Sequence, residues 1–455
     1  MRILILICRI LVGSLFIVSG LIKANDPLGF SYKLEEYFAE SALNMPGLMP
    51  YALGLAVLAC LAEIVLGFAV LVGGRLKLAT VSLVLLTIFF GWLTAFTGTC
   101  NDRHDTGTPM TYTIMENGQE IEREMTCVSD CGCFGDAMKG SVGRSLTPWE
   151  SFSKDAILFI LLIPILLAAF MRADTGWNTT ADDMILLPVG LVLVAFWSWI
   201  FTWWGPVWFT LVGVVGYLVI KKTIEGVKAE WITAAWVTVI TLVFTWYCFA
   251  HLPIRDYRPY AVGNSIVEQR AVAKPPVNQT FVSYKKIATG EVTEFDTSKP
   301  YPWNDSTYVN VPNSTRVVEL EPGILSQVSD FLLTDGDGNE ITEDILAEPT
   351  PVLLIMMYNV ESTRTDHLAE IAQLADTASK KGWYVYGVSA NTWEDVETMR
   401  HEHQLSFDFL QCDEKTVKTV IRSNPGILLL QQGTVRGKWH DNDVPDIVEV
   451  DGTLK

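Results

Sequence analysis

The chain has 455 residues, which gives it room for two to four domains. Its formal net charge of −18, with no basic stripe along the sequence, argues against a nucleic-acid-binding protein. Eight cysteines are too few for a disulfide scaffold of this length. The composition divides into an apolar first half with long hydrophobic runs and an acidic second half typical of a soluble domain.

Seven apolar runs predict transmembrane helices, since about 20 residues cross a ~30 Å hydrocarbon core. They cover residues 3–23, 51–72, 78–98, 155–172, 184–203, 207–220 and 231–250. A cleaved signal peptide is the alternative for the first run, but Lys23 stands where small residues would be expected. After this run, Phe30, Leu34, Tyr37 and Phe38 recur at helical spacing and predict an amphipathic helix on the membrane surface.

Basic residues in the short loops predict the orientation of the chain. If the N-terminus is cytoplasmic, one side collects Arg2, Arg75, Lys77, Arg172, Lys221, Lys222 and Lys228. The loop at 99–150 and everything after His251 then lie on the exported side. Cysteines in such an oxidising compartment tend to be paired or redox-active. Within this loop, residues 112–121 predict a β-hairpin with an Asn-Gly turn.

The soluble half predicts a β-rich linker region over 252–328 and a thioredoxin-like domain over 329–455. Strands and helices alternate in the second of these regions before a Pro and a β-hairpin, which is the order of a thioredoxin-like fold. The expected strands are 351–358, 383–389, 407–410, 427–431 and 435–439, and the expected helices are 362–380, 391–403 and 413–422.

Three cysteines fall within seven residues of the loop: Cys127, Cys131 and Cys133. Cys131 and Cys133 are close enough to act as an exchanging pair, with Cys100 and Cys127 as a partner pair. The alternatives are two structural disulfides or a metal site. The metal site is the weakest of the three, because His104 has no second ligand pair at zinc spacing and no metal is expected.

Charged side chains inside the predicted spans are a second set of candidates. Charged side chains such as Arg9 and Glu63 are costly at that depth. The two lie at similar distances from the cytoplasmic ends of their spans, which suggests a buried ion pair. The alternative is that they form a proton route or contact a quinone. Lys23 and the neighbours Lys154 and Asp155 lie near the cysteine loop. They serve as interfacial anchors, or they pair, or they lower a cysteine pKa.

The thioredoxin-like domain lacks the usual Cys-x-x-Cys, since its window at 359–365 contains no cysteine. Pro425 stands where a cis proline would line a substrate groove, and Asn424 precedes it. The lone Cys412 has no partner nearby in sequence. This domain is therefore expected to bind or position a partner through Asn424 and Pro425 instead of exchanging disulfides itself.

Several motifs resemble the DoxX-like membrane family, specifically the branch similar to the methylamine-utilisation protein MauE. They are RILVG from Arg9, SGLIK from Ser19, Asp26-Pro, Glu63 and CGCFGD from Cys131. The soluble half, with IRSNPG from Ile421 and Gly437-Lys-Trp, resembles long DoxX-family proteins of Bacteroidetes.

The resemblance implies a four-helix membrane domain at 1–172, an inner-membrane location and a role in periplasmic thiol or disulfide chemistry. The MauE-like branch is associated with maturation of a disulfide-rich enzyme subunit. This chain departs from the pattern by its extra helices at 173–251 and by a longer loop before the cysteines.

The sequence thus predicts a polytopic α-helical membrane domain followed by an α/β thioredoxin-like domain in the periplasm. Its expected partners are the lipid bilayer and a periplasmic client or redox protein, and a quinone is the candidate acceptor. The expected function is thiol–disulfide exchange. The alternative is a non-enzymatic scaffold with structural disulfides.

Overall fold

The computed structural model describes residues 2–116, 119–128, 132, 134, 136–171, 178–271, 277–311, 314–321, 326, 328 and 330–454. Within these residues, seven helices are long and apolar enough to cross a membrane, as the sequence predicted. They are α1 (Arg2–Asn25), α3 (Ala52–Val72), α4 (Leu76–Asp105), α6 (Pro148–Met171), α7 (Thr180–Ile200), α8 (Gly205–Thr223) and α9 (Val227–Ala250). The chain is therefore a multi-pass membrane protein.

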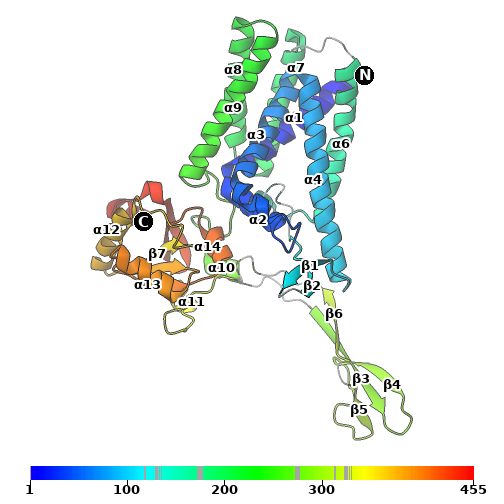
Figure 1. Ribbon diagram of the computed structural model, residues 1–455, viewed down its shortest axis with the longest axis vertical. Coiled ribbons are helices and arrows are strands. Elements are labelled where there is room, and N and C mark those ends of the chain that lie inside the picture. The colour runs from blue at the N-terminus through cyan, green and yellow to red at the C-terminus, as the bar shows by residue number, and fades with distance from the viewer. Residues whose placement is uncertain are drawn as a thin grey trace.

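Helix α1 lies at the centre of the bundle. One part of it packs with α4 and α6 around Val12, and another packs with α3 and α7 around Ile17. The N-terminus lies at the end of the bundle far from the C-terminal domain (Figure 1). At the other end, Asn25 donates a hydrogen bond to the carbonyl oxygen of Arg255 at 2.8 Å, so the end of α1 adjoins the segment after α9. We call this the domain-facing end.

The short helix α2 (Pro27–Phe38) follows α1 at the domain-facing end. It begins where the Asp26 carboxylate accepts a hydrogen bond from the Gly29 amide and Pro27 occupies the first turn. The helix was predicted correctly, but its apolar face, expected to lie on the membrane surface, is buried against protein in the same core as α1 and α3.

The loop between α4 and α6 carries the predicted hairpin, formed by β1 (Thr111–Glu116) and β2 (Gln119–Glu124). Its two turn residues, 117 and 118, lie outside the described residues. The short helix α5 (Ala137–Val142) follows the cysteine motif and returns the chain to α6.

The C-terminal domain is built on a five-stranded sheet in the order β11-β10-β7-β8-β9. The strands are β7 (Val352–Met357), β8 (Tyr384–Ser389), β9 (Asp408–Gln411), β10 (Gly426–Gln431) and β11 (Thr434–His440). Strands β7, β8 and β9 are parallel to one another. Strand β10 pairs antiparallel with β7, and β11 pairs antiparallel with β10. This βαβαβ unit followed by a β-hairpin is the thioredoxin-like arrangement that the sequence predicted.

Both faces of this sheet are covered, which explains why all six residues of β7 are buried. Leu353 and Ile355 face a core shared with α12 (Leu368–Lys380), α13 (Trp393–Glu402) and α15 (Ile447–Gly452). Leu354 and Met356 face the opposite core, which holds α10 (Ile266–Arg270), α11 (Thr342–Ala347) and α14 (Glu414–Val420). Helix α12 begins six residues later than predicted, because the residues before it form turns held by Asn424.

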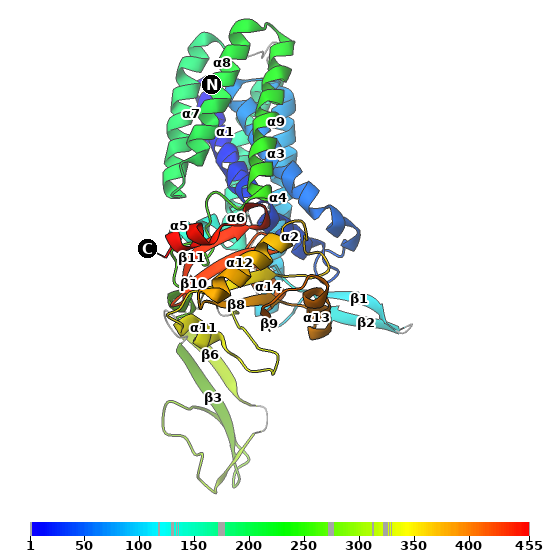
Figure 2. The same cartoon turned by 90° about the vertical axis from the view of Figure 1, so that its left-hand side faces the viewer.

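The region predicted as a β-rich linker forms a separate four-stranded sheet around β3 (Val277–Lys286). Strands β4 (Val292–Asp296), β5 (Tyr308–Asn310) and β6 (Arg316–Glu321) all pair with β3 in antiparallel register. This sheet projects as an arm away from both the bundle and the C-terminal domain (Figure 2).

Candidate functional site

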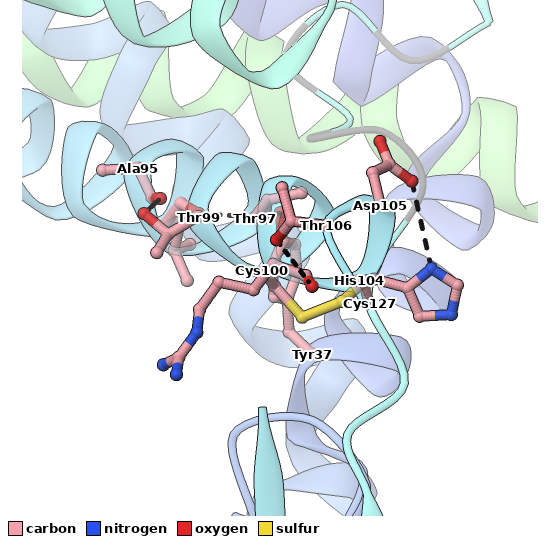
Figure 3. The surroundings of a disulfide bond; sticks show 11 residues. Tyr37, Ala95, Thr97, Thr99, Cys100, His104, Asp105, Thr106 and Cys127 are labelled. Atoms are coloured by element: carbon pink, nitrogen blue, oxygen red, sulfur yellow. Dashed lines mark hydrogen bonds and ion pairs between the residues drawn. A yellow bond between two sulfur atoms is a disulfide. The ribbon is translucent and has the colours of Figure 1, made fainter. Parts of the chain in front are cut away.

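Cys100 and Cys127 form a disulfide, so their predicted pairing is confirmed (Figure 3). Cys100 is buried near the end of α4, and Cys127 follows β2, with their Cα atoms 5.7 Å apart. The bond therefore fastens the loop to the third membrane helix just before the CGCFGD motif. Cys131 and Cys133 lie outside the described residues, so their role as an exchanging pair stays a prediction.

The described residues around the motif pack onto the domain-facing end of the bundle. Val128, Phe134 and Ala137 are buried in the core that also holds α1, α2 and α3. The Phe134 ring lies 5.1 Å from the ring of Phe201, measured between centroids. The motif is thus seated on the helices.

A small pocket of about 30 Å³ lies inside the bundle next to Gly132 and Phe134 of the motif, and we call it the intrabundle pocket. Two ion pairs line it: Lys23 Nζ to Glu63 Oε1 at 2.5 Å, and Lys154 Nζ to Asp155 Oδ1 at 2.5 Å. Lys23 also donates to the Ser19 hydroxyl at 3.1 Å. The pair of Lys154 and Asp155 is one of the arrangements that the sequence left open.

The predicted ion pair between Arg9 and Glu63 is wrong. In a helix each Cα–Cβ bond leans toward the helix N-terminus, and α1 and α3 run in opposite directions. Lys23 therefore leans into the bundle and Glu63 leans toward the domain-facing end, where the two meet. Arg9 leans toward the far end and donates to the carbonyl oxygens of Val70 at 2.8 Å and Leu71 at 3.2 Å, near the end of α3.

A larger cavity of about 590 Å³, the interdomain cavity, lies between the bundle and the C-terminal domain. Its walls come from the end of α1, from α2, from the segment after α9, and from α14 with Arg422. Gly132 and Phe134 of the CGCFGD motif line both this cavity and the intrabundle pocket. The motif therefore stands between the two spaces.

An ion pair between Asp26 and Arg422 joins the bundle to the C-terminal domain across this cavity. Arg422 Nε donates to the two Asp26 carboxylate oxygens at 2.9 and 3.1 Å. Burial opposes the charge on both groups, but their mutual attraction outweighs it. The pKa of Asp26 is accordingly lowered and the pKa of Arg422 is raised.

Further contacts secure the same interface. Lys415 on α14 pairs with Glu36 on α2 at 3.0 Å, and the Asn442 side chain donates to the carbonyl oxygen of Ala250 at 2.6 Å. His251, directly after α9, contacts the Asp443 carboxylate at 2.7 Å. Together with the ion pair of Asp26 and Arg422, these contacts hold the domain on the end of the bundle.

A buried cluster fixes the segment that links the bundle to the domain. Asp256 accepts hydrogen bonds from Arg258 Nε at 2.7 Å and from Lys438 Nζ on β11 at 2.7 Å. Burial and the charge of Arg258 lower the pKa of Lys438 to about 8, although Asp256 opposes this shift. The linker is therefore anchored to the sheet by charge as well as by packing.

The residues expected to bind a partner, Asn424 and Pro425, pack against their own domain. Asn424 and Pro425 are buried, and the bond between them is cis. The Asn424 side chain donates to the carbonyl oxygen of Asn359 at 2.8 Å, and its own carbonyl oxygen accepts from the Arg364 amide at 2.9 Å. Partner binding by Asn424 and Pro425 stays a prediction.

Cys412 is a poor candidate for thiol exchange. It is buried below the sheet, and burial raises the pKa of its thiol to about 12. No disulfide partner for it is found among the described residues.

Sequence reasoning missed both the partner of Glu63 and the contact between Asp26 and Arg422. The two residues of that contact are 396 positions apart, so no local pattern connects them. One signal was available: Asp26-Pro and IRSNPG were both among the motifs that carried the family resemblance.

Comparison with known proteins supports the assignment of the bundle. Residues 1–105 match the family of the methylamine utilisation protein MauE. The matched segment includes α1 to α4 with Lys23, Glu63 and Cys100, and it ends before the CGCFGD motif. No curated protein is significantly similar to the chain.

Among solved structures, the chain is similar to the solution structure of a protein assigned as a thioredoxin in Neisseria meningitidis. The two share 18% identity with a TM-score of 0.23, over 27% of this chain and 87% of the other. The strand order and pairing of the five-stranded sheet are those of a thioredoxin-like fold.

Proposed function

We propose that the protein is a membrane thiol–disulfide oxidoreductase whose exchanging pair is Cys131 and Cys133. The observation that carries this proposal is the position of the motif residues Gly132 and Phe134. They line an interdomain cavity that could receive a partner and also a charged pocket inside the membrane bundle. A motif with only a structural role has no need of both spaces.

In the exchange, the disulfide of the motif is passed to a pair of client thiols. A thiolate of a client attacks the disulfide between Cys131 and Cys133, one S–S bond forms, and the original S–S bond breaks. The second client thiol resolves the mixed disulfide, which leaves an oxidised client and a reduced motif. Reoxidation removes two electrons and two protons. A quinone in the bilayer is the acceptor class that we propose, with Cys100 and Cys127 as the relaying pair.

We further propose that the protein sits in a bacterial inner membrane with its N-terminus in the cytoplasm. The support is the distribution of basic residues. Arg2, Lys77, Lys221 and Lys228 belong to the helix ends and turns far from the C-terminal domain. The loop cysteines and the C-terminal domain then share the periplasm, where disulfides persist.

In this proposal the C-terminal domain binds the client or redox partner. It forms one wall of the interdomain cavity through α14 and Arg422, and its window at 359–365 offers no thiol of its own. A partner that enters this cavity meets the motif and the domain together.

The rival function is a scaffold whose cysteines are structural. It is favoured by the disulfide of Cys100 and Cys127, which fastens the loop to α4, and by the missing Cys-x-x-Cys. Replacement of Cys131 by Ser separates the two functions. Under our proposal periplasmic client proteins lose disulfides while the protein keeps its normal abundance. A loss of abundance with unchanged client disulfides would support the scaffold.

Cys412→Ser is the matched control for this experiment, because it removes a buried thiol from the same compartment. It should leave client disulfides unchanged. If Cys131→Ser and Cys412→Ser behave alike with normal abundance, the exchange function is refuted.

A further inference from the structure

The intrabundle pocket concentrates four charged side chains inside the membrane domain. Lys23 on α1 and Glu63 on α3 have side chains 5% and 1% exposed, and Asp155 on α6 is 4% exposed. Charges within transmembrane segments are costly and usually mark proton or substrate paths. Two ion pairs in one pocket therefore call for an explanation beyond packing.

Stability alone is a weak explanation. A buried ion pair gains little over well-packed apolar side chains, because desolvation of the charges offsets their attraction. In addition, each carboxylate leaves one buried oxygen, Glu63 Oε2 and Asp155 Oδ2, without a hydrogen-bond partner among the described residues. An acid with a spare buried oxygen carries a desolvation cost that a purely structural pair would avoid.

The pocket has the size and lining of a proton-binding site. Its volume of about 30 Å³ has room for about two water molecules, at roughly 10–15 Å³ each. Polar atoms of Ser19 and Thr87 share the wall with the ion pairs, while Phe30 and Phe90 close the rest. The atoms open to a proton or a water molecule are the second carboxylate oxygens, Glu63 Oε2 and Asp155 Oδ2.

Two described residues of the cysteine motif line the pocket: Gly132, which stands between Cys131 and Cys133 in the sequence, and Phe134. The Lys154 ammonium lies 5.6 Å from the centroid of the Phe134 ring.

We propose that Glu63 and Asp155 form a proton-transfer site that serves thiol exchange at the CGCFGD motif, with Lys23 and Lys154 holding the two carboxylates in place. This inference rests on the proposed function. It adds two acid–base residues and a direction of proton movement, between the motif and the interior of the bundle.

A thiol of the client loses its proton to a carboxylate oxygen of the site, and its sulfur keeps the electron pair and attacks the disulfide of Cys131 and Cys133. A mixed S–S bond forms, the S–S bond of the motif breaks, and the leaving motif thiolate takes the proton from the carboxylic acid. Neutralising the carboxylate also frees the charge of its lysine, which stabilises the thiolate.

The groups that set the pH dependence come from three helices. They are Lys23 from α1, Cys60 and Glu63 from α3, and Lys154 and Asp155 from α6. Helices α2 and α4 contribute the uncharged side chains of Phe30, Thr87 and Phe90 to the wall.

The first test detects the proton itself. The full-length protein in lipid nanodiscs is titrated with acid while its infrared spectrum is recorded. We expect a carboxylic acid C=O band that is lost in both Glu63→Gln and Asp155→Asn. Glu230→Gln is the matched control, because Glu230 is a buried membrane acid at the far end of the bundle that accepts from the Arg75 amide. If neither pocket variant changes the spectrum, the proton site is refuted.

The second test couples the site to sulfur chemistry. The rate of exchange between the reduced motif and a small aromatic disulfide is measured across pH for the wild type, Glu63→Gln, Asp155→Asn and Glu230→Gln. Positioned acid–base groups contribute about 10²- to 10⁴-fold, so each pocket variant should slow exchange at neutral pH by at least about 10-fold. The variants should also shift the pH profile, which lost stability would not do.

The two hypotheses fail in different ways. A wild-type motif that does not exchange at all refutes the proposed function, while the infrared titration still decides whether the pocket binds a proton. A motif that exchanges equally fast in all four proteins leaves the proposed function standing and overturns the proton-transfer site.

Discussion

Substitution of Asp26 by Asn should release the C-terminal domain from the bundle. The Asn side chain still accepts the hydrogen bond from the Gly29 amide that begins α2, since Asn caps helices as well as Asp does. What it removes is the negative charge that Arg422 Nε contacts at 2.9 Å. The change thus tests the ion pair with little effect on the helix.

The exposure of the two side chains sets the expected magnitude. Arg422 is 7% exposed and Asp26 is 22% exposed, so the pair belongs with buried ion pairs. Removing one partner of such a pair costs about 3–5 kcal/mol, because a buried charge is left without compensation. We take about 3 kcal/mol for this partly exposed case, which lowers the docking equilibrium constant roughly 100-fold.

Pulsed electron spin resonance measures the docked population. Genetically encoded spin labels at the exposed residues Asp105, at the end of α4, and Glu370, on α12, report the distance between bundle and domain. Wild type should give one narrow distance, and Asp26→Asn should add a second, broader one. Adding Arg422→Gln to that variant should restore part of the docking, because no unpaired charge remains.

Glu294→Gln is the control, since it breaks a solvent-exposed ion pair with Arg316 in the β-sheet arm, and such exposed pairs contribute little to stability. It should leave the distance unchanged. A single narrow distance in Asp26→Asn, or a double variant no better docked than the single one, would refute the assignment of this ion pair as the anchor.

Three further predictions concern the loop disulfide, Lys438 and Cys412. Replacing Cys100 and Cys127 by Ser opens a loop with a sequence separation of 27 and should cost about 3–4 kcal/mol, seen as a lower Tm in detergent; an unchanged Tm would contradict it. The pKa of Lys438 is lowered to about 8, so between about pH 8 and 10.4 the folded state binds fewer protons than the unfolded state. The free energy of unfolding, measured by denaturant titration, should therefore rise with pH in this range. Lys438→Met should abolish that rise. Cys412, with its pKa raised to about 12, should resist alkylation at pH 8 in the folded protein, and mass spectrometry showing rapid labelling would contradict its burial.

Acid should weaken the same docking interface. The pKa of Asp26 is lowered in the folded protein, so its contribution to docking is complete above the unfolded value of about 3.9. That contribution is lost as pH falls through the lower, folded pKa. The spin-label distance should therefore broaden in strong acid for the wild type. The Asp26→Asn variant should lose this pH dependence.

Sequence periodicity was enough to place the seven membrane helices and the strands of the C-terminal sheet. Apolar runs of about 20 residues and the continuous apolar stretch of β7 are local signals, because the apolar residues that form each pattern are next to one another in the sequence. The pairing of Cys100 with Cys127 could also be predicted from the sequence, because the loop contains few cysteines.

Side-chain partners across helices could not be found in this way. Height along a helix suggested that Arg9 faces Glu63, but the lean of side chains toward each helix N-terminus places Lys23 there instead. The sequence pattern of α2 predicts an apolar face, but the pattern is the same for a face that contacts lipid and for one that contacts protein. Docking by Arg422 depends on two surfaces that only the folded chain brings together.

The most direct test of the central claim is a redox titration of the loop cysteines in the full-length protein. The protein in native membranes is equilibrated in glutathione buffers, its free thiols are alkylated, and each cysteine is quantified by mass spectrometry. Thiol-exchange pairs have potentials of about −120 to −270 mV, whereas structural disulfides lie below about −300 mV. We predict that Cys131 and Cys133 change together within the exchange range. A pair that stays oxidised down to about −300 mV would contradict the exchange function.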